Sequence, residues 1–320
     1  MQKQDKEKIV FLDGLSLGKN PLKERLKMYQ AHFDFIEFDI TPANLVVERT
    51  KGATIVLTNK VVLNREILEV LKGTLKLICI TATGMNNIDL QAASEFGILV
   101  KNVAGYSTQS VAQHTLMLAL ALSGKLSFYD AYCKSGEYAR NPLFTNLAYP
   151  LHLIAGKKWG IIGLGSIGKN VAKLASAFGA EVSYYSTSGK NTNAEYPRKE
   201  LELLLKQSQI LSIHAPLNTN TQNLLNASNL GLLQEGAILI NVGRGGIVNE
   251  EDLAKELKKR EIYAGFDVFA KEPMEQNHPL LDKEFSNKLV LTPHNAWGYE
   301  ESKEILIDGI LKNIVEFMHS

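Results

Sequence analysis

The sequence has few cysteines and almost no net charge, and each scarcity excludes a class of protein. Cys79 and Cys133 are the two cysteines among 320 residues, and neither has a CxxC partner, so we expect no metal site, no disulfide framework and a reducing compartment. Cys79 lies in an apolar run and is expected to be buried. The formal net charge is +1, so nucleic acid is not an expected partner.

Long hydrophobic runs are also missing. The most apolar stretch, 115–123, is shorter than the roughly 20 residues that cross a bilayer. Residues 1–8 are polar and charged, unlike the apolar centre of a signal peptide. We therefore expect no membrane partner and a cytoplasmic location. At 320 residues, the chain exceeds the usual size of one hydrophobic core, which predicts two domains.

What the sequence does contain is an alternation of short apolar runs with amphipathic segments. It predicts strands at 8–13, 33–39, 53–58, 75–81 and 98–102, with helices at 21–30, 64–71 and 90–96. A second series predicts strands at 158–163, 181–186, 210–214, 237–242, 264–268 and 289–292, with helices that include 167–178 and 250–259. Such alternation predicts an α/β protein with two Rossmann-like or flavodoxin-like domains, parallel sheets and an interdomain cleft.

Three further segments complete the pattern. Residues 107–123 form a helical pattern that is apolar on most sides, which predicts burial between domains or against a second subunit, and hence a homodimer. Residues 128–148 are rich in Tyr and Asn and are interpreted as an irregular loop or arm. The chain closes with a predicted helix at 300–317.

A glycine-rich turn is the strongest local signal. An apolar strand leads into Gly163-x-Gly165-x-x-Gly168, and an apolar helix follows. Gly163 permits a tight turn, Gly165 allows the backbone to approach a pyrophosphate, and Gly168 lets helix and strand pack closely. The first N–H groups of the helix, at Ser166 and Ile167, are suited to phosphates. This context favours a dinucleotide-binding turn over a turn without a ligand.

The acidic residue that usually holds the ribose of NAD is missing. The second strand of this series ends at Ser186, and Thr187, Ser188 and Lys190 follow it. Hydroxyls and an ammonium suit a 2′-phosphate better than a carboxylate would. We therefore expect NADP or NAD as the cofactor, with NADPH slightly favoured; the alternative is that Ser186 is an ordinary loop residue and NAD is preferred.

Three polar residues follow predicted strands of the second series: Arg244, Glu272 and His294. Residues beyond the carboxyl ends of parallel strands face the ligand crevice. An imidazole can protonate a carbonyl oxygen, a neighbouring carboxylate can orient the ring, and a guanidinium can bind a carboxylate. Singly, each has a structural interpretation; together behind a dinucleotide turn they indicate reduction of a 2-oxo acid.

The sequence resembles the D-isomer-specific 2-hydroxyacid dehydrogenases. The resemblance rests on seven stretches between about residues 75 and 300: Gly84–Asp89, Gly105–His114, the glycine turn, His214–Leu217 with Thr221, Asn241–Gly246, Asp267–Pro273 and Thr292–Trp297. Within this family, the sequence resembles the glycerate dehydrogenase/hydroxypyruvate reductase branch at two places, the stretch Gly105–His114 and Trp297.

The resemblance implies a role for each matching residue. Arg244 would grip the substrate, Glu272 and His294 would form the acid–base pair, and Thr83 and Gly84 would present backbone N–H groups to the substrate carboxylate. Asp267 would hold the nicotinamide carboxamide, and the remaining cofactor contacts would come from Thr108, Ser166, Ile167, Pro216, Thr221, Val242 and Gly243.

The predicted activity is therefore an NAD(P)H-dependent oxidoreductase that reduces hydroxypyruvate, glyoxylate or a similar acid to the D-2-hydroxy acid. Residues 106–294 would form the dinucleotide-binding domain, and residues 1–105 with 295–320 the substrate domain. Two alternatives stay open: a non-enzymatic NAD(H)-sensing protein of the corepressor type, and a related phosphoglycerate or formate dehydrogenase. Four other histidines, His114, His152, His278 and His319, show no evident acidic partner in sequence and are interpreted as structural or surface residues.

Overall fold

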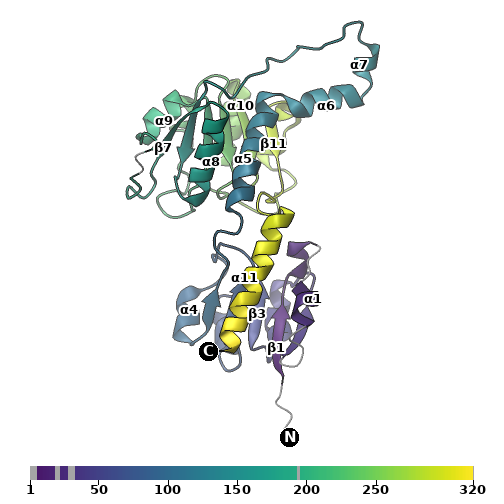
Figure 1. The fold of residues 1–320 in the computed structure, drawn as a ribbon, viewed down its shortest axis with the longest axis vertical. Helices are drawn as coiled ribbons and strands as arrows, with labels where there is room; N and C mark the ends of the chain where they lie inside the picture. The colour runs from purple at the N-terminus through teal and green to yellow at the C-terminus, as the bar shows by residue number, and fades with distance from the viewer. Residues whose placement is uncertain (1–5, 19–21, 28–32, 193–194, 320) are drawn as a thin grey trace. The chain divides into compact units, whose positions relative to one another are not determined.

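A computed structural model describes residues 6–18, 22–27, 33–192 and 195–319. The chain forms two compact units, Met1–Ser107 with Gly298–Ser320 and Thr108–Trp297 (Figure 1). Their boundaries lie close to the predicted positions 105/106 and 294/295. That the first unit binds substrate and the second the dinucleotide stays a prediction.

The first unit is built on a parallel sheet in the order β2-β1-β3-β4-β5. Its strands are β1 (Glu7–Phe11), β2 (Phe33–Glu37), β3 (Ile55–Thr58), β4 (Leu77–Ile80) and β5 (Leu99–Lys101). Four of them lie within predicted strands, and β1 begins one residue before the predicted strand 8–13. The flavodoxin-like order confirms the fold class. The order reverses between β1 and β3, so the carboxyl ends of these two strands flank the crevice of this sheet.

Helices pack against this sheet. The short ones are α1 (Leu22–Leu26), α2 (Val46–Thr50), α3 (Arg65–Leu71) and α4 (Leu90–Glu95), and the long one is the C-terminal α11 (Glu300–Met318). Residues 21 and 28–30 of the predicted helix 21–30 lie outside the described residues. Asn64 and Asp89 cap α3 and α4, since their side chains accept N–H bonds from Ile67 and Ala92.

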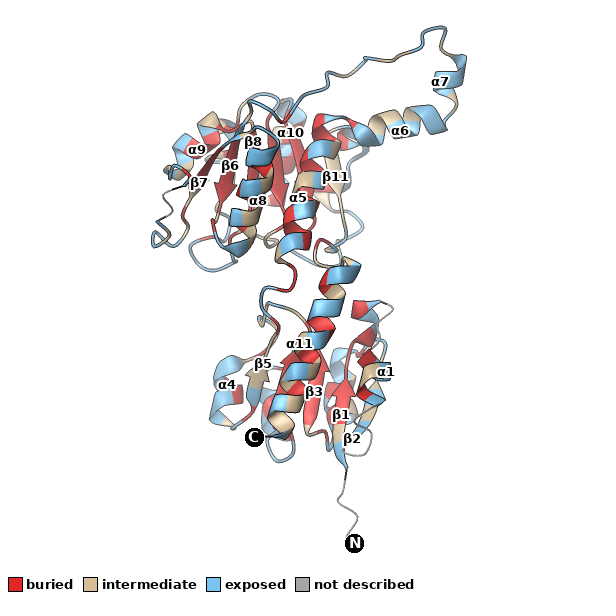
Figure 2. Cartoon of the chain, viewed as in Figure 1, coloured by how far each residue is buried: buried red, intermediate tan, exposed pale blue. Residues whose placement is uncertain are grey.

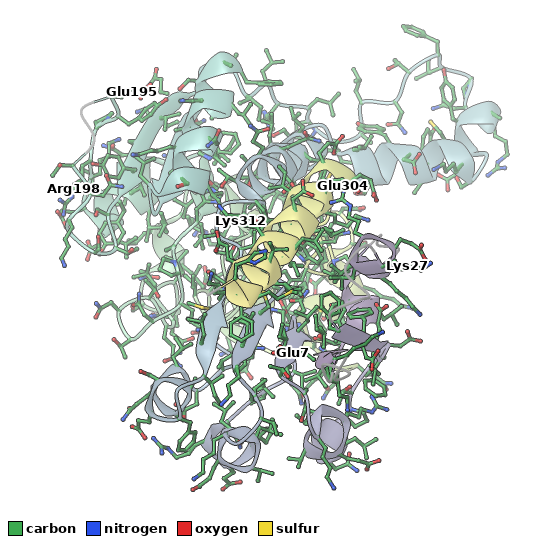
Figure 3. All side chains as sticks on the ribbon, turned by 60° about the horizontal axis from the view of Figure 1, so that its bottom comes forward. Glu7, Lys27, Glu195, Arg198, Glu304 and Lys312 are labelled. Atoms are coloured by element: carbon green, nitrogen blue, oxygen red, sulfur yellow. The ribbon has the colours of Figure 1, made fainter. Side chains whose placement is uncertain are left out.

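Ion pairs hold the C-terminal helix α11 to α1. Arg25 donates to Glu304 at 2.7 Å and also pairs with Asp308 on the next turn. Figure 3 labels Glu304 and Lys312 on this helix, whose other face buries Leu306, Ile310 and Ile314. Residues 298–320 therefore belong to the first unit although they follow the second in sequence.

The second unit is a six-stranded parallel sheet in the order β11-β10-β9-β8-β6-β7. Its strands are β6 (Lys158–Ile162), β7 (Glu181–Tyr185), β8 (Ile210–Ile213), β9 (Ile238–Asn241), β10 (Tyr263–Phe266) and β11 (Leu289–Leu291). All six were predicted. The order reverses between β6 and β8, and the glycine turn leaves the carboxyl end of β6, at that switch point.

Helices cover both faces of this sheet (Figure 2). One hydrophobic cluster joins α9 (Leu201–Gln207) and α10 (Glu250–Lys259) to the sheet. The other joins α5 (Thr108–Ser123) and α8 (Ser166–Ala177), with the buried Trp159 at its centre. The hydrophobic strands are buried on both faces, as expected for a doubly wound sheet.

The prediction that 128–148 is irregular was wrong in its first half. The chain forms α6 (Leu126–Lys134) and α7 (Glu137–Arg140) before an extended segment. Aromatic contacts hold this region together, because Phe128 packs edge-on against Tyr149 with ring centroids 4.5 Å apart. Helix α6 begins after Lys125, whose φ of 50° turns the chain away from α5.

Cys79 is buried, as predicted, and Cys133 is exposed; neither is in a disulfide. In the part of the chain that the structure describes, no helix is both long and apolar enough to cross a membrane.

Candidate active site

Hydrogen bonds to one buried carboxylate hold the loop that carries His294 in place. Asp267 follows β10 and is 1% exposed. Its Oδ1 accepts from the Thr292 hydroxyl at 2.6 Å and from the Asn295 N–H at 2.9 Å, and its Oδ2 accepts from the Ala296 N–H at 3.0 Å. Its carbonyl oxygen accepts from the His294 N–H at 2.8 Å. Asp267 therefore fixes the backbone on both sides of His294.

His294 and Glu272 form a direct pair. The Nδ1 of His294 lies 2.7 Å from Oε2 of Glu272, and the two side chains are 24% and 30% exposed. The other carboxylate oxygen, Oε1, accepts the Phe269 N–H at 3.0 Å. The imidazole therefore has a fixed carboxylate on Nδ1, which places Nε2 as the atom that can exchange a proton with a substrate.

The turn of Arg244 packs against the loop of Glu272. A Cβ added to Gly245 would lie 1.9 Å from the carbonyl oxygen of Phe269, so only glycine allows this approach. Asn241 secures the same turn, donating from Nδ2 to the Arg244 carbonyl at 3.0 Å and accepting from the Gly243 N–H at 3.1 Å. Arg244 is half-buried, and its Nη1 donates to the Gly243 carbonyl at 2.8 Å.

The glycine turn has the geometry that the spacing predicts. Gly163 has a φ of +90°, and a Cβ on Gly168 would lie 2.2 Å from the Gly163 carbonyl oxygen. Gly165 is the N-cap of α8, offers no side-chain cap, and has open space where a Cβ would point. No side chain at Gly165 therefore covers the first N–H groups of α8. This geometry fits the pyrophosphate of a dinucleotide.

Comparison with known proteins decides the family. Residues 116–296 match the model of the D-isomer specific 2-hydroxyacid dehydrogenase, NAD binding domain. The chain belongs to the D-isomer-specific 2-hydroxyacid dehydrogenases. The resemblance noted in the sequence is confirmed: the chain is a nicotinamide-dependent oxidoreductase of small 2-oxo and 2-hydroxy acids.

Relatives match this dehydrogenase over nearly its whole length. The glycerate dehydrogenase of Methylorubrum extorquens is 35% identical, over 98% of this chain and 96% of its own. The hydroxypyruvate reductase of Blautia hydrogenotrophica is 34% identical, over 97% of each chain. Among solved structures, an acyclic imino acid reductase in complex with NADPH and D-Arg matches with a TM-score of 0.85 and 28% identity, covering 98% of this chain and 97% of its own.

The residues predicted to meet the ribose side of the cofactor follow β7. Ser186 is buried, and its hydroxyl accepts the Asn191 N–H at 3.3 Å, while Ser188 and Lys190 are exposed. Arg198 was missed by the sequence analysis because it lies far along the chain from Ser186. Its Nη1 donates to the Gly189 carbonyl at 3.0 Å, which adds a guanidinium to this loop (Figure 3).

Several predicted cofactor residues lie beside the glycine turn or have structural contacts of their own. Gly243 packs against β8 and the segment after it, since an added Cβ would lie 3.1 Å from the Ala215 carbonyl oxygen. Thr221 is fully buried, and its hydroxyl donates to the Pro216 carbonyl at 2.7 Å. Val242 is buried after β9, and Thr108 begins α5. Their contacts with a cofactor stay predictions.

Thr83 and Gly84 lie in the first unit, in the turn after β4. The Thr83 hydroxyl donates to the Val103 carbonyl at 3.1 Å, and Asn102 donates to the Thr83 carbonyl at 2.6 Å. Asn313 of α11 in turn donates to the Asn102 carbonyl at 3.1 Å. The turn is therefore braced from two sides, and its contact with a substrate carboxylate stays a prediction.

Two of the four other histidines have acidic partners that are not evident in the sequence. His114 of α5 lies 3.7 Å from Asp267 and 3.0 Å from the Thr292 hydroxyl, and burial lowers the pKa of its ring. His278 lies 2.8 Å from Glu250. These partners are 153 and 28 residues away, separations that local patterns do not reveal. His152 and His319 are exposed, as predicted.

Proposed function

We propose that this dehydrogenase reduces hydroxypyruvate or glyoxylate to the D-2-hydroxy acid, with Arg244, Glu272 and His294 as its catalytic residues. The observation that carries the proposal is the 2.7 Å pair of His294 and Glu272, in which the loop of Glu272 packs against the turn of Arg244. Relatives named glycerate dehydrogenase, hydroxypyruvate reductase and glyoxylate reductase support this choice of substrate.

The reaction needs a hydride on C2 of the oxo acid and a proton on its oxygen. The bound dinucleotide supplies the hydride. The protonated His294 donates from Nε2 to the developing alkoxide, and Glu272 stabilises the imidazolium from the Nδ1 side. The guanidinium of Arg244 binds the carboxylate and the adjacent carbonyl oxygen, which draws electron density from C2. The backbone N–H groups at Thr83 and Gly84 are proposed as further donors to a substrate carboxylate.

A substrate panel tests this proposal. Consumption of reduced nicotinamide is followed with hydroxypyruvate, glyoxylate, pyruvate, phosphohydroxypyruvate and, for oxidation, formate, and the product is analysed on a chiral column. We expect the highest kcat/KM for hydroxypyruvate or glyoxylate, with D-glycerate formed from hydroxypyruvate. Turnover of none of these acids, despite binding of NADH, would contradict the proposal and favour a nucleotide-sensing protein.

For the cofactor, we propose a preference for NADPH over NADH. Support comes from Ser186 at the end of β7, where a carboxylate would repel a 2′-phosphate, and from Lys190 and Arg198 on the same loop. The ratio of kcat/KM values for the two cofactors at one substrate concentration tests this choice. A clear excess for NADH would overturn it.

For the assembly, we propose a cytoplasmic homodimer formed by the second unit. Helix α5 exposes Met117 and Leu120, and the segment after α7 exposes Phe144 at 89% and Leu153 at 77%. Apolar side chains exposed to this extent mark an interface, and a second copy supplies a matching apolar surface. Light scattering on the purified protein tests it: we expect twice the chain mass, and a Phe144→Asp variant that dissociates. A monomeric wild type would contradict the dimer.

A further inference from the structure

A second carboxylate–imidazole pair joins helix α10 to the segment that follows Glu272. Oε2 of Glu250, at the start of α10, lies 2.8 Å from Nε2 of His278, and the side chains are 7% and 9% exposed. The Leu280 N–H donates to Nδ1 of the same ring at 3.3 Å. A ring that accepts on Nδ1 carries its proton on Nε2, so Nε2 of His278 donates to the Glu250 carboxylate.

The other oxygen of Glu250 holds the loop of Glu272. Oε1 accepts the Ala270 N–H at 2.8 Å, and the N–H of the preceding residue, Phe269, goes to Glu272. The Phe269 ring also meets the His278 ring edge-on, with centroids 6.0 Å apart. The two carboxylates therefore bind successive N–H groups of one chain segment.

The same segment is the contact point of the Arg244 turn. A Cβ on Gly245 would lie 1.9 Å from the carbonyl oxygen of Phe269 and 2.5 Å from the nitrogen of Ala270. The peptide between Phe269 and Ala270 is thus pressed from one side by the turn of Arg244 and bonded by Glu250 through its N–H. A shift of this peptide moves both Glu272 and the turn.

We propose that Glu250, oriented by His278, is a positioning residue that sets the Glu272–His294 pair against the Arg244 turn by holding the Phe269–Ala270 peptide. The inference rests on the proposed catalytic roles of Glu272, His294 and Arg244. Neither Glu250 nor His278 touches the substrate in this account. Their effect reaches the reaction through one backbone N–H.

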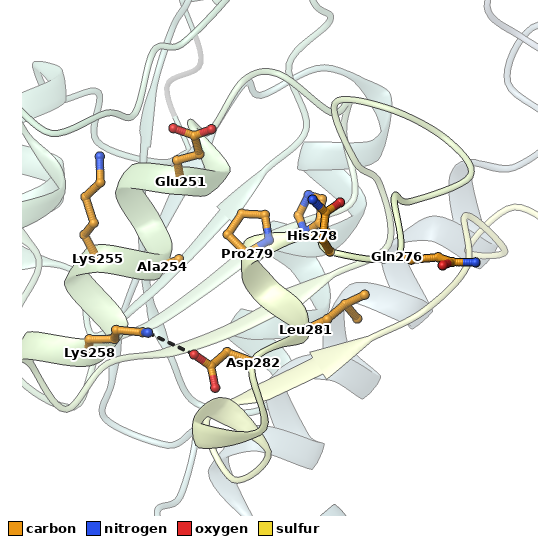
Figure 4. A pocket seen from close by; sticks show the side chains of 10 residues that line it. Glu251, Ala254, Lys255, Lys258, Gln276, His278, Pro279, Leu281 and Asp282 are labelled. Atoms are coloured by element: carbon orange, nitrogen blue, oxygen red, sulfur yellow. Dashed lines mark ion pairs between the residues drawn. The ribbon is translucent and has the colours of Figure 1, made fainter.

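Glu251, on the open surface beside the Glu250–His278 pair, provides a control residue, and we do not propose a ligand site there. A cavity of about 660 Å³ is lined by His278, Glu251, Lys255 and Lys258, among others (Figure 4). Its lysines are already neutralised, because Lys258 pairs with Asp282 at 2.9 Å and Lys255 with Asp252 at 3.1 Å. Glu251 is exposed and extends from α10 away from the His278 ring (Figure 4). It therefore carries the same charge on the same helix turn without the loop contact.

The experiment compares Glu250→Ala with Glu251→Ala in the full chain. Loss of a hydrogen bond to a charged group predicts a kcat lower by about tenfold for Glu250→Ala, with the KM for NADPH unchanged. Glu250→Gln recovers part of the kcat, since its amide oxygen still accepts the Ala270 N–H while its NH2 group faces the Nε2–H of His278, a second donor. Should Glu250→Ala fail to fold, His278→Gln carries the test, with a smaller loss of kcat in the same direction.

A second readout does not depend on turnover. The proton on Nδ1 of His294, hydrogen-bonded to Glu272, gives a low-field NMR signal in the apoprotein, which Glu272→Ala identifies by removing it. We expect Glu250→Ala to weaken or broaden this signal and Glu251→Ala to leave it unchanged. If the wild type reduces no 2-oxo acid, the proposed function fails while the signal still tests the positioning. A kcat and a signal in Glu250→Ala equal to those of Glu251→Ala would overturn the inference.

Discussion

His294 is held in a left-handed backbone conformation, with a φ of 51°, while its Nδ1 lies 2.7 Å from Oε2 of Glu272. A histidine adopts such a conformation only when its surroundings impose it, and here Asp267 accepts the His294 N–H and two neighbouring N–H groups. The imidazole is therefore aimed by its backbone before any substrate binds. Strain of this kind is found where a reacting group must be oriented in advance.

Arg244 is predicted to contribute to substrate binding and to turnover. Arg244→Ala removes the partner of both the carboxylate and the developing alkoxide, so kcat/KM for hydroxypyruvate falls on the order of a thousandfold, with a higher KM for the acid and a lower kcat. Arg244→Lys keeps the charge but not the forked geometry and recovers only part of the loss. Steady-state kinetics with NADPH at saturation checks this. Near wild-type values in Arg244→Ala would remove the residue from the mechanism.

Gly245 is predicted to tolerate no side chain. A Cβ would overlap the Phe269 carbonyl oxygen at 1.9 Å, so Gly245→Ala pushes the loop of Glu272 away and costs about 1–3 kcal/mol of unfolding free energy. We expect kcat to fall in parallel. The matched control is Gly231→Ala, where an added Cβ has nothing within 4 Å among the described residues. The test measures urea unfolding and kcat for both variants. An equal unfolding free energy and an equal kcat in the two variants would contradict the packing argument.

The course of the strands was readable from the sequence because strands buried on both faces are continuous apolar runs. Apolar runs such as Ile238–Asn241 could be assigned as strands, and the glycine spacing located the turn after β6. Arg244, Glu272 and His294 were identifiable because each follows the carboxyl end of a strand, where parallel sheets gather their functional groups.

What the sequence did not reveal depends on contacts between distant residues. The sequence placed Glu250 at the start of a predicted helix and His278 among structural or surface histidines, and only the fold shows that they lie 2.8 Å apart. Arg198 is brought close to the loop of Ser186 by a backbone bridge to Tyr184 and by its hydrogen bond to the Gly189 carbonyl. Helix α6 was missed because its aromatic residues have weak helix propensity. It is stabilised instead by ring contacts of Phe128 with Tyr132 in the helix and with Tyr149 beyond it.

A carboxylate at Ser186 is predicted to reverse the cofactor preference. In Ser186→Asp the new charge repels a 2′-phosphate and can accept from ribose hydroxyls, so kcat/KM for NADPH falls by about tenfold or more while that for NADH is kept or rises. The two cofactors assayed on the same preparation provide the internal control. An equal loss with both cofactors would mean that the substitution damages the fold near the buried Ser186 rather than its selectivity.

His214 is predicted to make stability depend on pH. Its ring Nδ1 is buried without a hydrogen-bond partner in the part of the chain described, and burial lowers the pKa from 6.5 to about 3. Between these values the unfolded chain binds one more proton than the native one, so the stabilisation is complete above pH 6.5 and is lost as the pH falls toward 3. The contribution to the slope is at most about 1.4 kcal/mol per pH unit.

The measurement for His214 is urea unfolding at several pH values for the wild type and for His214→Gln, which cannot titrate in this range. We expect a shallower loss of unfolding free energy on acidification in the variant. An unchanged slope would show that this ring does not account for the acid sensitivity.

The most direct test of the acid–base pair is a double-mutant cycle on kcat for hydroxypyruvate reduction. His294→Ala lowers kcat on the order of a hundredfold or more, because the proton donor is lost. Since Glu272 takes part in the proton transfer only through the ring, Glu272→Ala is damaging alone but adds almost nothing to His294→Ala. The account predicts a double variant as active as His294→Ala; a double variant slowed by the product of the two single effects, or a His294→Ala enzyme close to wild type, would contradict it.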